Sequence, residues 1–163
     1  MDFEKPYTPE KRKGREYLVS LEKEGRFMFH GSPKKMDIIT PQQAYGDDKK
    51  TNQRENDGAP GVFGTQVADI GIFHALMKQS QEGCEGSFGE GGDSEKGTYH
   101  MHASAALIER VKKDGLEAYV HILDKKDFSD FRAVDARSNN AVNVIDVVRV
   151  GFEDLPENIE IID

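Results

Sequence analysis

The clearest pattern of apolar and polar positions lies in residues 27–30, Phe-Met-Phe-His, which are followed by Gly31 and Pro33. This alternation predicts a β-strand that turns its two phenylalanines to one face and His30 to the other. The glycine and the proline predict that the strand ends there, and a glycine lets a ligand approach the backbone closely. His30 is therefore either a ligand contact at a strand end or an ordinary half-buried histidine with a satisfied hydrogen bond.

A helix is expected immediately before this strand. Leu18 and Leu21 stand at helical spacing. A threonine followed by Pro9 has the residue types of an N-cap and a first helical position, and Gly25 is a typical stop signal. The pattern predicts a helix over about residues 9–24.

A second strand and helix follow further along the chain. Residues 62–63, Val-Phe, predict a short strand. Thr65 is suited to cap a helix over residues 67–78. The apolar positions of this helix predict one packed face, formed by Val67, Ile70, Met77 and either Phe73 or His74.

Two polar segments predict loops. Residues 46–61 are rich in Asp, Lys, Asn and Gly, which indicates one long surface loop. Residues 81–97 contain six glycines among acidic residues and predict a flexible insertion. Cys84 lies in this insertion, where no fixed base would activate its thiol.

The second half of the chain is rich in strand patterns. Residues 99–104 alternate between apolar and polar side chains. Residues 106–111 and 116–123 fit two strands joined by a tight turn at Asp114-Gly115, with a short helix over residues 105–113 as the alternative. Further extended segments are expected at residues 37–39, 119–123, 142–150 and, as an edge strand, 159–162.

Together these elements predict an α+β fold of two helices and several short strands. A chain of 163 residues suits a single domain, residues 1–163, with one core. Because the sequence has no Gly-x-Gly-x-x-Gly or phosphate-loop pattern, a doubly wound dinucleotide-binding sheet is not expected.

Composition adds an expectation about location. Hydrophobic residues make up 36% of the chain and charged residues 32%, and no apolar run approaches the roughly 20 residues that span a bilayer. The N-terminus lacks the pattern of a secretory signal, and a single cysteine allows no internal disulfide. We therefore expect a cytoplasmic protein without membrane contact. A net charge of −8 argues against broad contact with nucleic-acid phosphates.

Three short motifs support a resemblance. Residues 29–32 (Phe-His-Gly-Ser), 39–41 (Ile-Thr-Pro) and 61–65 (Gly-Val-Phe-Gly-Thr) occur in this order. The order resembles the NAD-binding core of ADP-ribosyltransferases of the poly(ADP-ribose) polymerase and diphtheria-toxin type. In that family a strand ends in His-Gly-Ser or His-Gly-Thr, and a later strand of the form Gly-Ile/Val-Tyr/Phe precedes a helix. The match covers residues 27–74 and implies a split, twisted, antiparallel-rich sheet with a few helices.

The resemblance also implies that NAD is the substrate and that the strand end binds it. His30 would hydrogen-bond a ribose hydroxyl, a role that suits imidazole because one ring nitrogen can be held while the other faces the ligand. The backbone of Gly31 would clamp the nicotinamide carboxamide. Ser32 would add a hydroxyl, and Thr65 would line the cleft.

An aromatic ring on the following helix stacks on nicotinamide in that family. Phe73 or His74 fills this position, depending on one residue of alignment. We assign Phe73 to the site, with a role as an ordinary core residue as the alternative.

Catalysis in that family needs a glutamate near the start of a late strand, which stabilises the cation formed as nicotinamide leaves. Residues 134–142 contain no glutamate, so Asp135 is the best substitute and Asp146 is a second candidate. The resemblance implies transfer of ADP-ribose to a protein, nucleic-acid or small-molecule acceptor. If neither aspartate reaches the ribose, the protein would be an inactive scaffold that binds NAD, ADP-ribose or a partner.

A different class of function starts from the other histidines. His100 and His102 stand at i and i+2 of an expected strand, and His121 lies on another. Two imidazoles at that spacing can share a metal ion that a third ligand completes. The alternative is that Met101 faces the core and both histidines face solvent.

Overall fold

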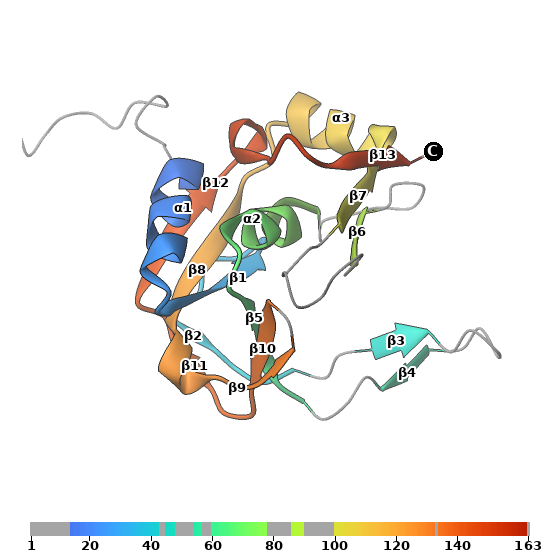
Figure 1. Cartoon of the computed structure of the whole chain (residues 1–163). Coiled ribbons are helices and arrows are strands. Elements are labelled where there is room, and N and C mark those ends of the chain that lie inside the picture. Colours follow the sequence, from blue (N-terminus) through green and yellow to red (C-terminus); the bar gives the residue numbers. More distant parts are fainter. Residues whose placement is uncertain are drawn as a thin grey trace, which may run out of the picture.

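The computed structural model describes residues 14–42, 45–47, 54–56, 60–77, 86–89, 100–132 and 134–162. Its centre is a six-stranded sheet in the order β12-β8-β1-β5-β10-β9, in which every neighbouring pair is antiparallel (Figure 1). The strands are β1 (Phe27–Ser32), β5 (Val62–Thr65), β8 (Ala118–Asp124), β9 (Ser129–Arg132), β10 (Asp135–Ser138) and β12 (Asp146–Val150).

Smaller β-structures surround this sheet. One has the order β13-β7-β6, with β13 parallel to β7, and the other two are the antiparallel pairs β2–β11 and β3–β4. Their strands are β2 (Ile38–Ile39), β3 (Tyr45–Asp47), β4 (Arg54–Asn56), β6 (Gly86–Gly89), β7 (His100–Ser104), β11 (Val142–Asn143) and β13 (Glu160–Ile162). The described residues therefore form a mixed α+β structure with a mostly antiparallel main sheet.

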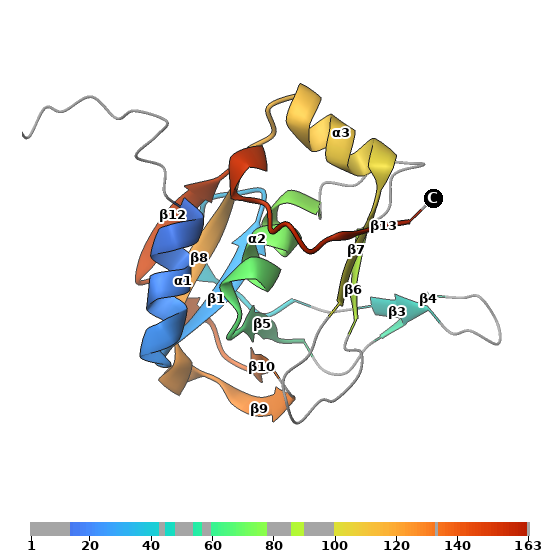
Figure 2. The same cartoon turned by 45° about the horizontal axis from the view of Figure 1, so that its top comes forward.

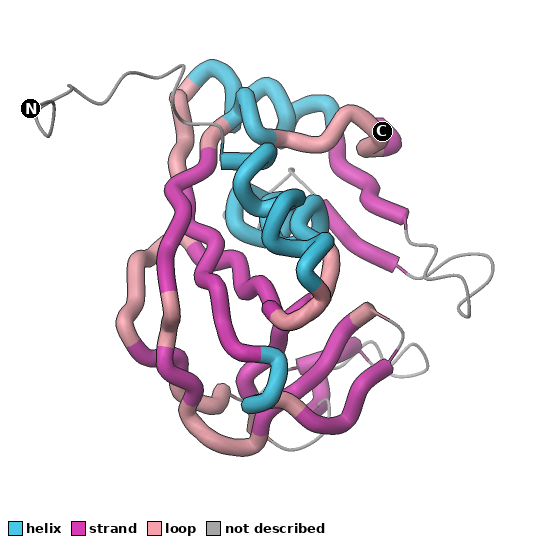
Figure 3. Tube along the Cα trace, turned by 60° about the vertical axis from the view of Figure 1, so that its left-hand side comes forward, coloured by secondary structure: helices cyan, strands magenta, loops and turns pink. Residues whose placement is uncertain are grey.

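Helix α2 (Ala68–Met77) lies against the main sheet, with α1 (Gly14–Glu24) beside it and β6 and β7 on its other side (Figure 2). Figure 3 shows the helices gathered on one side of the main strands. The third α-helix is α3 (Ala105–Lys113), and short 3-10 helices follow at Lys125–Asp127 and Phe152–Asp154. Asp69 and His74 are the half-buried positions of α2, whose other residues are all buried.

Two hydrophobic clusters cover the two faces of the main sheet. On the α2 face, Phe29, Leu18 and Phe73 belong to one cluster of buried residues. On the opposite face, Met28 packs with Leu123 and other apolar side chains. Both Met28 and Phe29 are 0% exposed, so this part of β1 is covered on both sides. The predicted alternation is therefore confirmed, and both of its faces are buried.

Most predicted elements are confirmed, with different boundaries. The helix before β1 is present from Gly14, while the predicted start at Pro9 lies outside the described residues. β1 continues through Gly31 to Ser32, two residues beyond the predicted end, because β8 pairs with it throughout. The strands expected near residues 38, 62, 101, 120 and 161 are present.

Four predictions need correction. The hairpin over residues 106–123 is wrong, because residues 105–113 form the alternative helix, capped by Ser104, which accepts from the Leu107 N–H at 3.1 Å. The expected strand over residues 142–150 is divided into β11 and β12. The two expected loops contain the β3–β4 pair and β6. Helix α2 packs on nearly all sides and not on one face.

Candidate ligand site at the end of β1

The neighbours of β1 change along its length. Its ladder to β8 runs from Phe27↔Asp124 to Ser32↔Tyr119. Its ladder to β5 has one register pair, Phe29↔Thr65. That register would place Gly31 opposite Phe63, yet the Phe63 carbonyl accepts a hydrogen bond from His30 Nδ1 at 2.6 Å. The His30 ring therefore bridges β1 and β5 at the point where their ladder stops.

The backbone of Gly31 is oriented by the same geometry. Alternate residues of an antiparallel strand turn their N–H and C=O groups to alternate neighbours. The His30 carbonyl faces β8, because it accepts from the ring Nδ1 of His121 there. The peptide groups of Gly31 therefore point toward β5, beyond the last register pair of that ladder.

Gly31 is a glycine because of helix packing. A Cβ at this position would overlap Gly71 O and Ala75 N and would lie 2.9 Å from Ala75 Cα. The close approach that the sequence suggested for a ligand is therefore made by α2 on this face of β1. A ligand could therefore contact Gly31 only through the peptide N–H and C=O groups that point toward β5.

Two predicted hydroxyl contacts already have partners. Ser32 Oγ accepts from the Lys34 N–H at 3.2 Å, within the turn that follows β1. Thr65 is 3% exposed, and its Oγ1 accepts from the Val67 N–H at 3.2 Å and donates to the Val134 carbonyl at 3.4 Å. The predicted helix cap at Thr65 is therefore wrong: α2 begins at Ala68, whose N–H donates to Glu22, and the Thr65 hydroxyl instead bonds the segment that joins β5 to α2.

Phe73 is a core residue. It is 1% exposed. Gly71 and Ala75 face β1, and Phe73 stands two residues from each, so at about 100° per residue it lies on the opposite side of the helix. Phe73 therefore has the burial and the cluster of an ordinary core residue, as the alternative interpretation describes. His74 is half-buried, lies nearer to the β1 side, and is the better candidate for a stacking ring.

Asp135 is the first residue of β10, and its Cα is paired with that of Thr65. Gly64 faces Met28, so Thr65 and Asp135 lie on the opposite, α2 face of the sheet. The alternation of β1 puts His30 and Ser32 on the Met28 face. The structure therefore brings the predicted residues onto three neighbouring strands but divides their side chains between two faces.

Asp146 lies apart from this group. It is on β12, at the other edge of the sheet. Its Oδ2 accepts from the Tyr17 hydroxyl at 3.3 Å, and its Oδ1 accepts from the Val147 N–H at 2.8 Å. The pKa of Tyr17 is raised by partial burial and by the Asp146 carboxylate. Asp146 is therefore separated by β8 from the strand end that carries His30, and Asp135 is left as the candidate carboxylate.

Sequence reasoning missed two residues beside Asp135. Phe63 is 41% exposed, and its Cα is paired with that of Arg137. The Arg137 stem lies over Gly61, and its Nη2 donates to Asp130 Oδ2 at 3.1 Å. Arg137 stands two residues after Asp135 on the same face of β10, so the strand period alone would have found it.

The structure removes His121 as a third ligand of the predicted metal site, for which a carboxylate was the other candidate. His121 is 0% exposed, and both of its ring nitrogens are bonded to backbone groups. His102 lies in another sheet, 3.6 Å from Glu160 Oε2, while Met101 faces the core. Among the residues with a described placement, no three His, Cys, Asp or Glu side chains are grouped as metal ligands. Cys84 lies outside the described residues.

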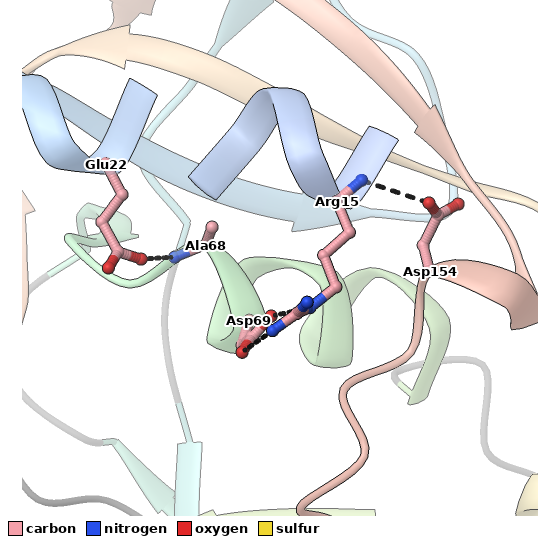
Figure 4. Close-up of polar contacts among 5 residues, drawn as sticks. All are labelled: Arg15, Glu22, Ala68, Asp69 and Asp154. Carbon is pink, nitrogen blue, oxygen red and sulfur yellow. Dashed lines mark hydrogen bonds and ion pairs between the residues drawn. The ribbon is translucent and has the colours of Figure 1, made fainter. Parts of the chain in front are cut away.

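A separate polar cluster joins α1, α2 and the segment after β12 (Figure 4). Arg15 donates to both carboxylate oxygens of Asp69, at 2.8 and 3.1 Å, and its backbone N–H donates to Asp154 at 3.1 Å. The Ala68 N–H donates to Glu22 at 2.6 Å. An open hollow of about 490 Å³ lies beside this cluster, lined by Arg15, Asp69, Glu153, Leu155, Glu157 and Asn158. These contacts join α2 to α1, and α1 to the segment after β12.

Comparison of the chain with protein-family models, curated proteins and solved structures finds no match. No helix of the described residues is both long and apolar enough to cross a membrane.

Proposed function

We propose that the end of β1 binds NAD and that the protein is an ADP-ribosyltransferase, with the split sheet of that family. The observation that carries the proposal is the end of the β1–β5 ladder at His30. There the His30 ring donates to the Phe63 carbonyl. The Gly31 peptide groups point toward β5, beyond the last register pair of the β1–β5 ladder; we call this place the split between the two strands. This is where the resemblance expects a ribose hydroxyl and a carboxamide to bind.

The arrangement of the motifs gives further support. The two motif strands, β1 and β5, are neighbours, and β10 is next to β5. Asp135 begins β10, as the family's glutamate begins a late strand. Because His30 and Asp135 lie on different faces, the proposal requires NAD to enter the split itself. His74 would supply the stacking ring in place of Phe73.

The chemistry assigned to this site is cleavage of the bond between nicotinamide and ribose. Nicotinamide leaves with the bonding electron pair, and positive charge develops on the ribose. The Asp135 carboxylate would stabilise that charge, because a fixed anion acts most strongly where charge develops. The nucleophile of an acceptor then bonds to the ribose carbon.

Nicotinamide release from NAD tests this assignment. We expect release by the wild-type protein and at least a tenfold slower rate in Asp135→Ala, with NAD affinity changed less than the rate. Asp135→Glu, which restores the family's side-chain length, should be at least as fast as wild type. The matched control is Asp127→Ala, an exposed carboxylate on the 3-10 helix after β8. A rate unchanged in Asp135→Ala contradicts the assignment.

The second candidate function is a binding scaffold without transfer. One observation favours it: the carboxylate that begins β10 is an aspartate, one methylene shorter than the family's glutamate. Saturable NAD binding without nicotinamide release, in the presence of wild-type protein, would select this candidate.

A further inference from the structure

A buried histidine lies directly beside the proposed NAD contact. His121 is on β8, is 0% exposed, and its Cα is paired with that of His30. The two rings meet edge to face, with centroids 6.0 Å apart. The resemblance assigns no role to His121.

The hydrogen bonds of His121 define its tautomer. The Met36 N–H can only donate, so His121 Nε2, 3.0 Å away, must accept with a lone pair. The His30 carbonyl can only accept, so Nδ1, 3.1 Å away, must carry the proton. The ring is therefore neutral. Burial lowers its pKa, against a smaller opposite effect of the bond to the His30 carbonyl.

These two bonds connect β8, the His30 peptide and the turn that follows β1. One holds the His30 peptide to β8, and the other holds the turn that leaves β1. Met36 follows that turn, in which the Lys34 N–H bonds Ser32 Oγ. After it, the Asp37 carbonyl accepts from the Val144 N–H at 3.0 Å. His121 is thus the side chain that ties the strand end to its exit turn.

We infer that His121 is a positioning residue, which holds the His30–Ser32 strand end and the Met36 turn in the shape that binds the ligand. The inference rests on the proposed NAD site for its ligand. It does not place His121 in contact with NAD, because its side chain is 0% exposed and both ring nitrogens are bonded to backbone groups. Its effect on binding would act through the placement of the His30 ring.

Two substitutions separate the bonds. In His121→Asn the side-chain amide nitrogen can replace Nδ1 and donate to the His30 carbonyl, but nothing then accepts from Met36. In His121→Gln the side-chain amide oxygen can replace Nε2 and accept from Met36, but nothing then donates to His30. The matched control is Ile122→Val, which changes the next buried residue of β8, on the α2 face.

The measurements are NAD titration by calorimetry and long-range ¹H–¹⁵N spectra of the histidine rings, in conditions where each variant is folded. We expect about tenfold weaker NAD binding in both His121 variants and less than a twofold change in Ile122→Val. In the free wild-type protein and in the control the His30 ring should keep its proton on Nδ1, which donates to the Phe63 carbonyl, and in the His121 variants this tautomer should no longer be fixed.

A His30 proton still fixed on Nδ1, together with unchanged NAD affinity, in the folded His121 variants would overturn the inference. If the wild-type protein does not bind NAD, the proposed function fails, and the His30 ring signals still decide whether His121 positions that residue. If neither variant folds, the wild-type spectrum decides. A proton on Nδ1 of His121 supports the inference, and a proton on Nε2 contradicts it, because Met36 could not then donate to the ring.

Discussion

The two halves of β1 differ, although they are consecutive residues of one strand. Residues 27–29 belong to the ladder with β8, and Phe29 is also paired with β5. In residues 30–32 the ladder to β8 continues. On the β5 side, the His30 ring donates to the Phe63 carbonyl, which in a continued ladder would accept from a backbone N–H. The first half holds the fold together. The second half is where we propose that the ligand binds.

Replacement of neighbouring residues should separate the two halves most strongly. Phe29→Ala should lower the free energy of unfolding by about 3–5 kcal/mol, because it leaves a cavity in the buried cluster between β1 and α2. His30→Ala should cost only about 1 kcal/mol, the value of its bond to Phe63. Urea denaturation measures both. Equal losses would contradict the division of the strand.

Gly31→Ala should show that α2 packs closely against one face of the second half of β1. The new methyl group would overlap the backbone of α2 at Gly71 and Ala75, which should cost about 2–3 kcal/mol. Gly64→Ala is the matched control, because its Cβ would meet the Phe128 ring at 3.1 Å and a side chain can move aside more easily than a helix. A smaller loss in Gly31→Ala than in Gly64→Ala would show that α2 is not the reason for the glycine.

The rings of α2 test which side of that helix faces the ligand. Phe73→Leu should lower stability by about 1 kcal/mol without changing NAD affinity in the folded protein. His74→Ala should leave stability nearly unchanged, because the residue is half-buried, and should weaken NAD binding several-fold. The reverse result in paired calorimetry and denaturation would restore Phe73 as the stacking ring.

Acid should weaken the protein through His121. Burial lowers the pKa of His121 in the folded state. As the pH decreases through the unfolded value of about 6.5, the unfolded chain therefore binds more protons than the folded protein, and the free energy of unfolding decreases. His121→Gln removes this contribution. The difference between the denaturation midpoints of the wild type and the variant should therefore change between pH 7.5 and 5.5. A constant difference would mean that His121 does not titrate in this range.

Local sequence patterns predicted the parts of the fold that depend on alternation and capping. The strands at residues 27–30 and 119–123 are examples, since their side-chain period is read directly. The hairpin at Asp114-Gly115 was wrong because the same dipeptide ends a helix: Gly115 has φ +59° as the residue after the α3 C-cap. Leu107 and Val111, four residues apart and both buried, carried the helical signal.

The site was less predictable, because its residues depend on tertiary packing. A sequence cannot distinguish a glycine approached by a ligand from one approached by a helix, and Gly31 is the second case on its α2 face. Likewise, Phe73 and His74 are adjacent in an apolar helix that is buried on nearly all sides, so no amphipathic face indicated which ring is directed to the core. No strand was predicted at residues 135–138, and the face of Asp135 relative to His30 follows only from the register of β5 and β10.

The most direct test of the central claim is calorimetric titration of NAD into the wild-type protein and into His30→Ala, at a temperature where both are folded. The claim predicts saturable binding with a stoichiometry of about one in the wild type and at least tenfold weaker binding in the variant, since His30 would lose a ligand contact as well as its bond to Phe63. No binding by the wild-type protein, or equal affinity in the two proteins, would contradict it.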